Sequence, residues 1–390
     1  MGTKNYAYIN GKILKWAREQ TPFYSLEEMT PRLKKLKIKN EEVIEWENGS
    51  KYPTINQAKN LAKLYNISFA ALYLSEIPKI NKPEYIDRRV VNNNPIYEIS
   101  YELWRGIRDC ISKRDILLDI APDFISTFNP LPKLKSDSIP EIVKKIRTYL
   151  KLETTLNYYK DYNNPFNYFR KILEQNGIMV FQLSNIPITE MKGISIYYEK
   201  LPIIIINNKD WAKAKVFTLF HELAHLLRRT SSLCLVDLNQ THYNEEKICD
   251  KIAAEILLPE EEFYNNIADI KKNLNKENEF YLYLEKVANQ FGVSPVVVLR
   301  RLYDLDIIDL EYYNNQYKKL SESFNKNKNK NKGNLKIKQC NIYLSKNGYL
   351  FPRGLLNTYS NGDISYGEMC FLLDIKSKHI TSIEERVMFV

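Results

Sequence analysis

Apolar residues occur at helical spacing in the first part of the chain. Between residues 11 and 75, short amphipathic stretches alternate with breakers that contain Gly or Pro, and Ile55, Ala58 and Leu61 recur every three positions. Stretches of this length bury little surface alone, so we expect them to share one small core. The pattern predicts five short helices, at residues 11–20, 25–35, 40–46, 54–65 and 68–74.

The pattern changes in the middle of the chain. Short runs of β-branched and aromatic residues, bounded by Gly, Pro and Asn, predict three strands, at residues 178–181, 194–198 and 203–206. They precede a helix at about 211–228 that is apolar nearly all round, which is typical of a buried element. A second helix is expected at 244–258. Together these elements predict an α+β fold that is mainly helical and has a small sheet.

Other segments divide the chain into parts. At roughly 150 residues per domain, 390 residues suggest two or three domains. Residues 76–164 begin with a stretch rich in Pro and charge and read as a linker and helical connector. The alternating Asn and Lys residues at 325–332 cannot form a core, so residues 311–333 are expected to be a flexible linker. Residues 334–390 are expected to form a small C-terminal domain of unknown role.

Composition narrows the function classes. Hydrophobic residues make up 44% and charged residues 27%, which excludes disorder over most of the chain. The formal net charge of +10 favours an acidic partner such as nucleic acid, although the many Asn, Ile, Lys and Tyr residues also suggest the bias of an AT-rich genome. Five widely spaced cysteines exclude a disulfide framework, and no apolar run approaches about 20 residues. We therefore expect a cytoplasmic protein with no membrane association.

An H-E-x-x-H motif lies in the predicted apolar helix. His221 and His225 are four residues apart, so their imidazoles lie on one helix face and can share a metal ion. Glu222 flanks that face and could reach a water held by the metal. The alternative is two core histidines bonded to backbone carbonyls. It would require two separate buried partners, whereas one zinc ion satisfies both imidazoles.

The next predicted helix offers a third ligand. Glu246 and Asp250 continue an otherwise apolar stripe, where carboxylates would be costly to bury without a cation. We expect Glu246 to bind the metal and Asp250 to accept a hydrogen bond from a ligand histidine, while Glu245 and Glu255 face elsewhere. A solvated acidic helix start is the alternative. His242 precedes Glu246 by one helical turn and is either an oxyanion stabiliser or a loop histidine.

These two segments resemble the ImmA/IrrE family of zinc metallo-endopeptidases. Residues 217–227 carry the H-E-L-A-H motif, and residues 246–259 follow the family pattern E-x-x-A-N-x-F-A-A-E-L-L-M-P, with Cys249, Asp250 and Ile252 replacing its Ala, Asn and Phe. Asp250 moves the sequence toward the E-x-x-x-D arrangement of gluzincin peptidases. The resemblance implies a zincin-like core at residues 165–310.

The same resemblance implies roles for the motif residues. One Zn²⁺ per chain would be held by His221, His225 and Glu246, and Glu222 would be the catalytic base. Substrate would lie extended along an edge strand at residues 194–198.

The N-terminal region resembles the Xre-type helix-turn-helix of longer family members. This implies an all-α helix-turn-helix domain at residues 11–75. The helix that should enter the major groove carries Glu41, Glu42 and Glu45, which repel phosphate. The basic residues just before that helix are Lys34, Lys35, Lys37 and Lys39. They suit either weak DNA binding or docking of a protein partner, and the sequence leaves both open.

Family members cleave helix-turn-helix repressors and so derepress genes. The resemblance therefore implies a zinc-dependent endopeptidase whose partner is a transcriptional regulator of a mobile element, a phage or a stress response. The alternative is a non-proteolytic DNA-binding regulator or antitoxin-like protein with a structural zinc site. The sequence specifies neither the scissile bond, nor the activating signal, nor the oligomeric state.

Overall fold

The computed structural model describes residues 5–23, 25–78, 99–134, 138–152, 164–229, 232–233, 240–327 and 338–388. The chain divides into two compact units, Met1–Asp109 and Cys110–Val390, and the boundary falls within helix α6 (Tyr101–Ile120). The fold is α+β and mainly helical, as the sequence predicts.

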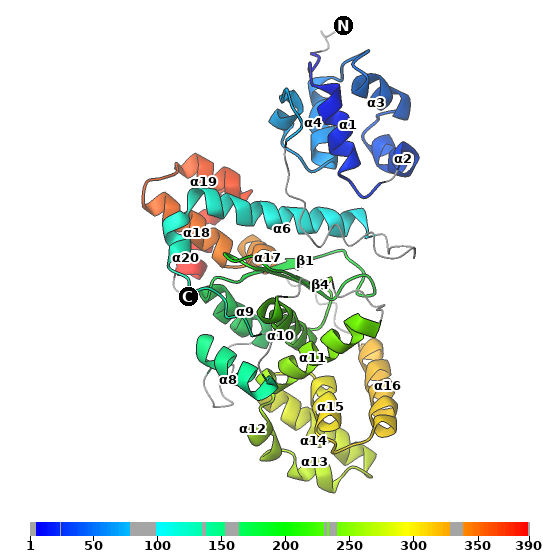
Figure 1. Cartoon of the computed structure of the whole chain (residues 1–390), viewed down its shortest axis with the longest axis vertical. Coiled ribbons are helices and arrows are strands. Elements are labelled where there is room, and N and C mark those ends of the chain that lie inside the picture. Colours follow the sequence, from blue (N-terminus) through cyan, green and yellow to red (C-terminus); the bar gives the residue numbers. More distant parts are fainter. Residues whose placement is uncertain are drawn as a thin grey trace. The chain divides into compact units, whose positions relative to one another are not determined.

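The N-terminal unit is a cluster of short helices (Figure 1). Its elements are α1 (Gly11–Glu19), α2 (Leu26–Lys35), α3 (Asn40–Glu47), α4 (Ile55–Leu64) and the 3-10 helix η1 (Phe69–Tyr73). Ser25 caps α2, and Thr54 forms a capping box with Gln57 at the start of α4, so local sequence sets where these helices begin. Leu14, Trp46 and Leu61 belong to their shared core.

A small sheet lies at the centre of the larger unit. Its strands are β1 (Met179–Leu183), β2 (Gly193–Ile196), β3 (Ile203–Asn207) and the two-residue β4 (Ser232–Leu233), in the order β1-β3-β2-β4. β1 and β3 are parallel, whereas β2 is antiparallel to both of its neighbours. Every residue of β1, β2 and β3 is buried, which explains why these strands read as continuous apolar runs.

The expected edge strand at residues 194–198 is corrected in two respects. The strand ends at Ile196, and β4 pairs with Ile194 and Ser195, so β2 is not an edge over those residues. Two residues are too few to show the alternation that marks a strand in sequence, and β4 was therefore not expected.

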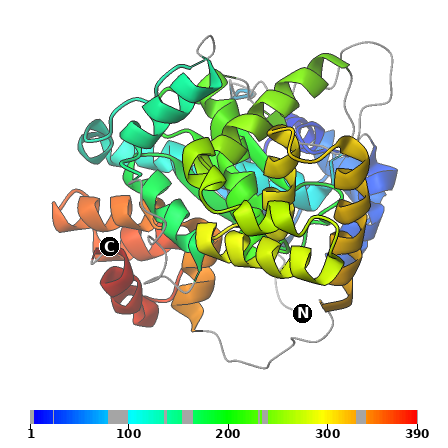
Figure 2. The same ribbon diagram turned by 90° about the horizontal axis from the view of Figure 1, so that it is seen from below.

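Helices surround the sheet. α10 (Ala212–Arg228) packs against β2, β3, α9 (Pro165–Gln175) and α11 (Gln240–Leu257). The other helices from Cys110 to residue 327 are α7 (Pro122–Ser126), α8 (Ile139–Tyr149), α12 (Glu260–Tyr264), α13 (Ala268–Lys272), α14 (Glu277–Phe291), α15 (Pro295–Asp304) and α16 (Leu310–Asn327). α15 packs against both α14 and α11, and Figure 2 shows α14 and α15 in yellow.

Part of the expected flexible linker at 311–333 is helical. The described portion forms α16, whose Tyr312 hydroxyl donates a hydrogen bond to the carbonyl of Leu274 at 2.7 Å. Lys319 of α16 also forms an ion pair with Glu277 at 2.7 Å. Anchoring by aromatic side chains to the neighbouring helices outweighs the polar composition of this stretch. Residues 328–333 lie outside the described residues.

The C-terminal module (residues 338–388) belongs to the same compact unit as the sheet. It contains α17 (Gln339–Asn347), α18 (Leu350–Ser360), α19 (Tyr366–Leu373), the 3-10 helix η2 (Ser377–His379) and α20 (Ile380–Met388). α17 lies beside β1 (Figure 1). The expected small C-terminal domain packs on the sheet through α17 and α18.

A buried pair of charges holds this module. The side chains of Arg170 and Glu174 on α9 are 1% and 3% exposed. Arg170 donates hydrogen bonds to the carbonyls of Leu344 and Ser345, at 3.0 and 2.8 Å, in the last turn of α17. Glu174 accepts a hydrogen bond from the backbone N–H of Tyr349 at 3.0 Å, where α18 begins. The cation therefore lies at a helix C-terminus and the anion at a helix N-terminus, as the two helix dipoles favour.

Candidate metal centre

Two neighbouring helices bring the predicted ligands together. α10 carries His221 and His225 one turn apart, and α11 packs against it and carries Glu246. The two Nε2 atoms are 3.1 Å apart, and Glu246 places Oε2 at 3.0 Å from Nε2 of His221 and Oε1 at 3.2 Å from Nε2 of His225. His221 is 8% and His225 2% exposed. The ligand atoms therefore converge on one shielded point.

The chemistry of this donor set fits a zinc ion. Two imidazole nitrogens 3.1 Å apart can share at most one proton, whereas a metal ion accepts a lone pair from each. Ligand atoms of a tetrahedral zinc site with Zn–N of about 2.0–2.1 Å lie about 3.3 Å apart. Burial opposes ionisation of Glu246, but its contacts with both imidazoles outweigh this and hold its pKa well below the ordinary value. The predicted third ligand is therefore an anion, as in zinc sites with two histidines and a glutamate.

Asp250 orients the first of these histidines. Its Oδ1 is 2.8 Å from Nδ1 of His221, on the side of the ring away from the cluster. An Nδ1 that donates to this carboxylate leaves Nε2 with the lone pair that a metal binds. Sequence reasoning missed Arg300 of α15, whose Nη1 is 3.8 Å from Oδ2 of Asp250. No spacing rule links residues 250 and 300, since only the packing of α15 on α11 brings them together.

Glu222 follows His221 on α10, and its side chain points toward the sheet. It is 0% exposed, and its side chain packs toward Gly193 at the start of β2. A buried carboxylate on the residue that follows a predicted metal ligand suits a proton acceptor.

The neighbouring carboxylates are paired with arginines. Glu245 forms a two-point ion pair with Arg228, at 2.5 and 3.0 Å, and Glu255 pairs with Arg301. A second group of donor atoms, from His225, Glu245 and Cys249, also lies close together. Burial raises the pKa of the Cys249 thiol and so opposes formation of the thiolate that a metal binds. The group of His221, His225 and Glu246 is the better metal site.

The role of His242 stays a prediction. α11 begins at Gln240, so the backbone of His242 is helical, but its side chain lies outside the described residues.

In the N-terminal unit, Lys34, Lys35, Lys37 and Lys39 are all exposed around the end of α2 and the start of α3. The acidity of α3 is less available to a partner than its sequence suggests. Glu42 accepts a hydrogen bond from the backbone N–H of Lys39, Glu45 pairs with Lys51, and Glu47 forms a two-point ion pair with Arg18. Of the four carboxylates at residues 41–47, two are thus paired with cations and a third is bonded to the backbone within this unit.

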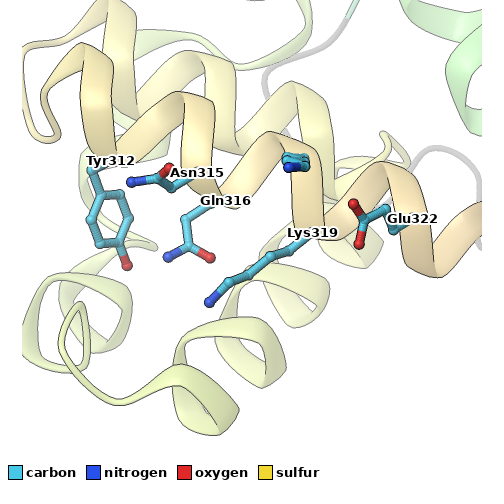
Figure 3. Close-up of a pocket in the computed structure, with 6 residues that line it drawn as sticks. Tyr312, Asn315, Gln316, Lys319 and Glu322 are labelled. Atoms are coloured by element: carbon cyan, nitrogen blue, oxygen red, sulfur yellow. The ribbon is translucent and has the colours of Figure 1, made fainter.

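A shallow polar groove follows α16 and is separate from the metal centre. It is lined by Tyr312, Asn315, Gln316, Lys318, Lys319 and Glu322 (Figure 3). None of the histidines or carboxylates described above contributes to it. Lys319 is already paired with Glu277, so the groove offers no concentrated charge for a ligand.

Comparison with known proteins agrees with the site. Residues 173–303 match the model of the family Peptidase_M78, described as the IrrE N-terminal-like domain, and this range contains all of the metal-centre residues. No curated protein matches the chain. Among solved structures, a Mycobacterium tuberculosis transcriptional regulator is 14% identical over 50% of this chain and 51% of the regulator, with a TM-score of 0.28. The chain spans about half the length of that regulator, and a likeness this distant carries no argument. At residues 173–303, the chain therefore contains an IrrE-like domain of the M78 peptidase family.

Proposed function

We propose that this chain is a zinc-dependent endopeptidase. The observation that carries the proposal is the convergence of His221, His225 and Glu246 beside Glu222, within a domain of a peptidase family. Zinc, when bound, supplies Lewis acidity that polarises both a water and the scissile carbonyl. The two imidazoles and the carboxylate of Glu246 would hold the ion. Glu222 would accept a proton from the attacking water and pass it to the leaving amine.

The surroundings of these residues support such a reaction. Asp250 and Arg300 hold His221 in the orientation that a ligand needs, and burial of Glu222 keeps competing water from its carboxylate. We propose His242 as a candidate oxyanion stabiliser because the helix extends through its position.

We further propose that the substrate is a helix-turn-helix repressor of a mobile element, a phage or a stress regulon. An extended substrate segment would pair with the sheet. Since β4 already pairs with Ile194 and Ser195, the substrate would have to displace β4 or bind outside it. Such a barrier disfavours general proteolysis and suits one docked partner. The exposed lysines at 34–39 are the candidate docking or weak DNA-binding surface.

The second candidate function is a DNA-binding regulator with a structural zinc site. The observation that favours it is the helical N-terminal unit with its exposed lysines and internally balanced α3 carboxylates. It requires no chemistry from Glu222.

Replacing Glu222 by Gln separates the two candidates. The wild type and Glu222→Gln are each co-expressed with a candidate helix-turn-helix repressor, and the repressor is followed by immunoblot and mass spectrometry. We expect cleavage at one or very few bonds by the wild type, none by Glu222→Gln, and equal zinc content in both. Glu245→Gln is the matched control, because that carboxylate pairs with Arg228. Cleavage that persists in Glu222→Gln would refute the proposal, as would an intact repressor under inducing conditions.

A further inference from the structure

Gly193 stands where the side chain of Glu222 meets the sheet. A Cβ atom built on Gly193 would lie 2.5 Å from Oε1 of Glu222, 2.9 Å from its Cγ, and 2.7 Å from Cγ2 of Thr218. All three distances are shorter than real side chains tolerate. Two of the three contacts are with Glu222.

Backbone conformation does not require glycine here. Gly193 is not among the residues with positive φ, and it lies in regular antiparallel pairing with Ile206 of β3. An L-residue could adopt this extended conformation without strain. The requirement is therefore for space above the strand, on the side that faces α10.

We propose that Gly193 is a positioning residue for Glu222. Its missing side chain leaves a niche over the start of β2, and the carboxylate of Glu222 occupies that niche with 0% exposure. The helix on one side and the strand backbone on the other allow the carboxylate few other positions. This inference rests on the proposed function, in which Glu222 moves the proton.

A simpler role for Gly193 is to let α10 approach β2 closely. That role would explain the short distance between a Cβ atom at position 193 and Cγ2 of Thr218. The two roles differ in what relieves the clash. If the niche serves Glu222, shortening Glu222 should make a methyl group at position 193 tolerable. If the glycine serves only helix packing, shortening Glu222 should change little.

The first test is a thermal-unfolding cycle that needs no proteolysis. Gly193→Ala is made in the wild type and in Glu222→Ala, which removes every Glu222 atom beyond Cβ. We expect Gly193→Ala to lower Tm by several degrees in the wild type and by less than half as much in the Glu222→Ala background. Gly367→Ala is the matched control, since a Cβ there would meet only Oγ of Ser365, at 3.9 Å. Because alanine favours a helix more than glycine does, this control should leave Tm unchanged or slightly raised, and to the same extent in both backgrounds.

The second test is kinetic. Displacing Glu222 by about 1 Å should lower kcat by at least about tenfold, with KM and zinc content unchanged. In Glu222→Gln, which keeps the shape but not the base, Gly193→Ala should cause no further loss of the residual rate. A purely structural role would lower zinc content, or would lower the residual rate of Glu222→Gln further.

Each outcome decides the inference. Equal Tm losses on Gly193→Ala in the wild type and in Glu222→Ala would overturn it. A normal kcat in Gly193→Ala would overturn it as well. If the single variant Gly193→Ala fails to fold while the double variant with Glu222→Ala folds, this result would support the niche for Glu222. If neither variant folds, the clash lies with Thr218 and the inference fails. A thermal cycle with the expected coupling, together with a wild type that cleaves no repressor, would support the niche and refute the endopeptidase proposal.

Discussion

Replacing Arg170 by Met is expected to destabilise the sheet and the C-terminal module together. The guanidinium donates to the carbonyls of Val180 in β1 and of Leu344 and Ser345 in α17, and it lies 3.8 Å from the carboxylate of Glu174. Methionine keeps most of the apolar stem and removes every one of these donors. The side chain is 1% exposed, so water does not replace them.

The magnitude follows from what the substitution leaves behind. Removing one partner of a buried ion pair costs about 3–5 kcal/mol, because the remaining charge stays buried without its counter-ion. Native domains are stable by only about 5–15 kcal/mol, so this loss is a large part of the total. Glu174→Gln should cost less, since the amide oxygen still accepts from the N–H of Tyr349.

Urea unfolding and hydrogen exchange measure this effect. We expect a lower midpoint for Arg170→Met and faster exchange in both β1 and α17. Arg386→Met is the matched control, because Arg386 is exposed in the same module. A loss below about 0.5 kcal/mol, which is the range of ordinary surface substitutions, would refute the reasoning. So would faster exchange confined to α17, because it would make the module an independent unit.

Three further predictions concern the metal, pH and nucleic acid. Glu246→Ala should lose zinc by elemental analysis while Glu245→Ala keeps it, and full occupancy in Glu246→Ala would remove that residue from the site. Burial lowers the pKa of Lys215 from 10.5 to about 8, so the unfolded chain holds more protons between those values and stability should rise with pH there. Relative to Lys215→Met, the wild type should gain about 2 kcal/mol from pH 8 to 10 in urea unfolding, and parallel curves would contradict this. DNA binding through the lysines at 34–39 should be weak and fall steeply with salt in titrations, and a salt-resistant footprint on one operator would argue against it.

The parts of the site that a single helix encodes were predictable from sequence. His221 and His225 lie four residues apart, and Glu246 and Asp250 likewise, so helical periodicity places each pair on one face. The structure brings all four together. Arg300 could not be predicted, because its approach to Asp250 depends on how α15 packs against α11.

The same distinction applies to the fold. Arg170 and Glu174 are four residues apart, a spacing that normally indicates an exposed ion pair, yet both are buried under α17 and α18. Their burial depends on a segment about 170 residues later, for which no local pattern exists. The Asn and Lys residues at 325–332 suggested a linker, whereas Tyr312 and its neighbours anchor the first part of α16. Local propensity is overridden there by tertiary contacts.

The late position of the C-terminal module in the chain has a consequence for synthesis. Arg170 is translated 174 and 175 residues before Leu344 and Ser345, whose carbonyls it binds. At about 5–20 residues per second, β1 waits on the order of 10–30 s for α17 to arrive beside it. β1 is an outer strand of the sheet, and an uncovered outer strand readily pairs with another chain. Nascent chains therefore pass through an interval in which aggregation competes with docking, and chaperones that bind exposed strands would act within it.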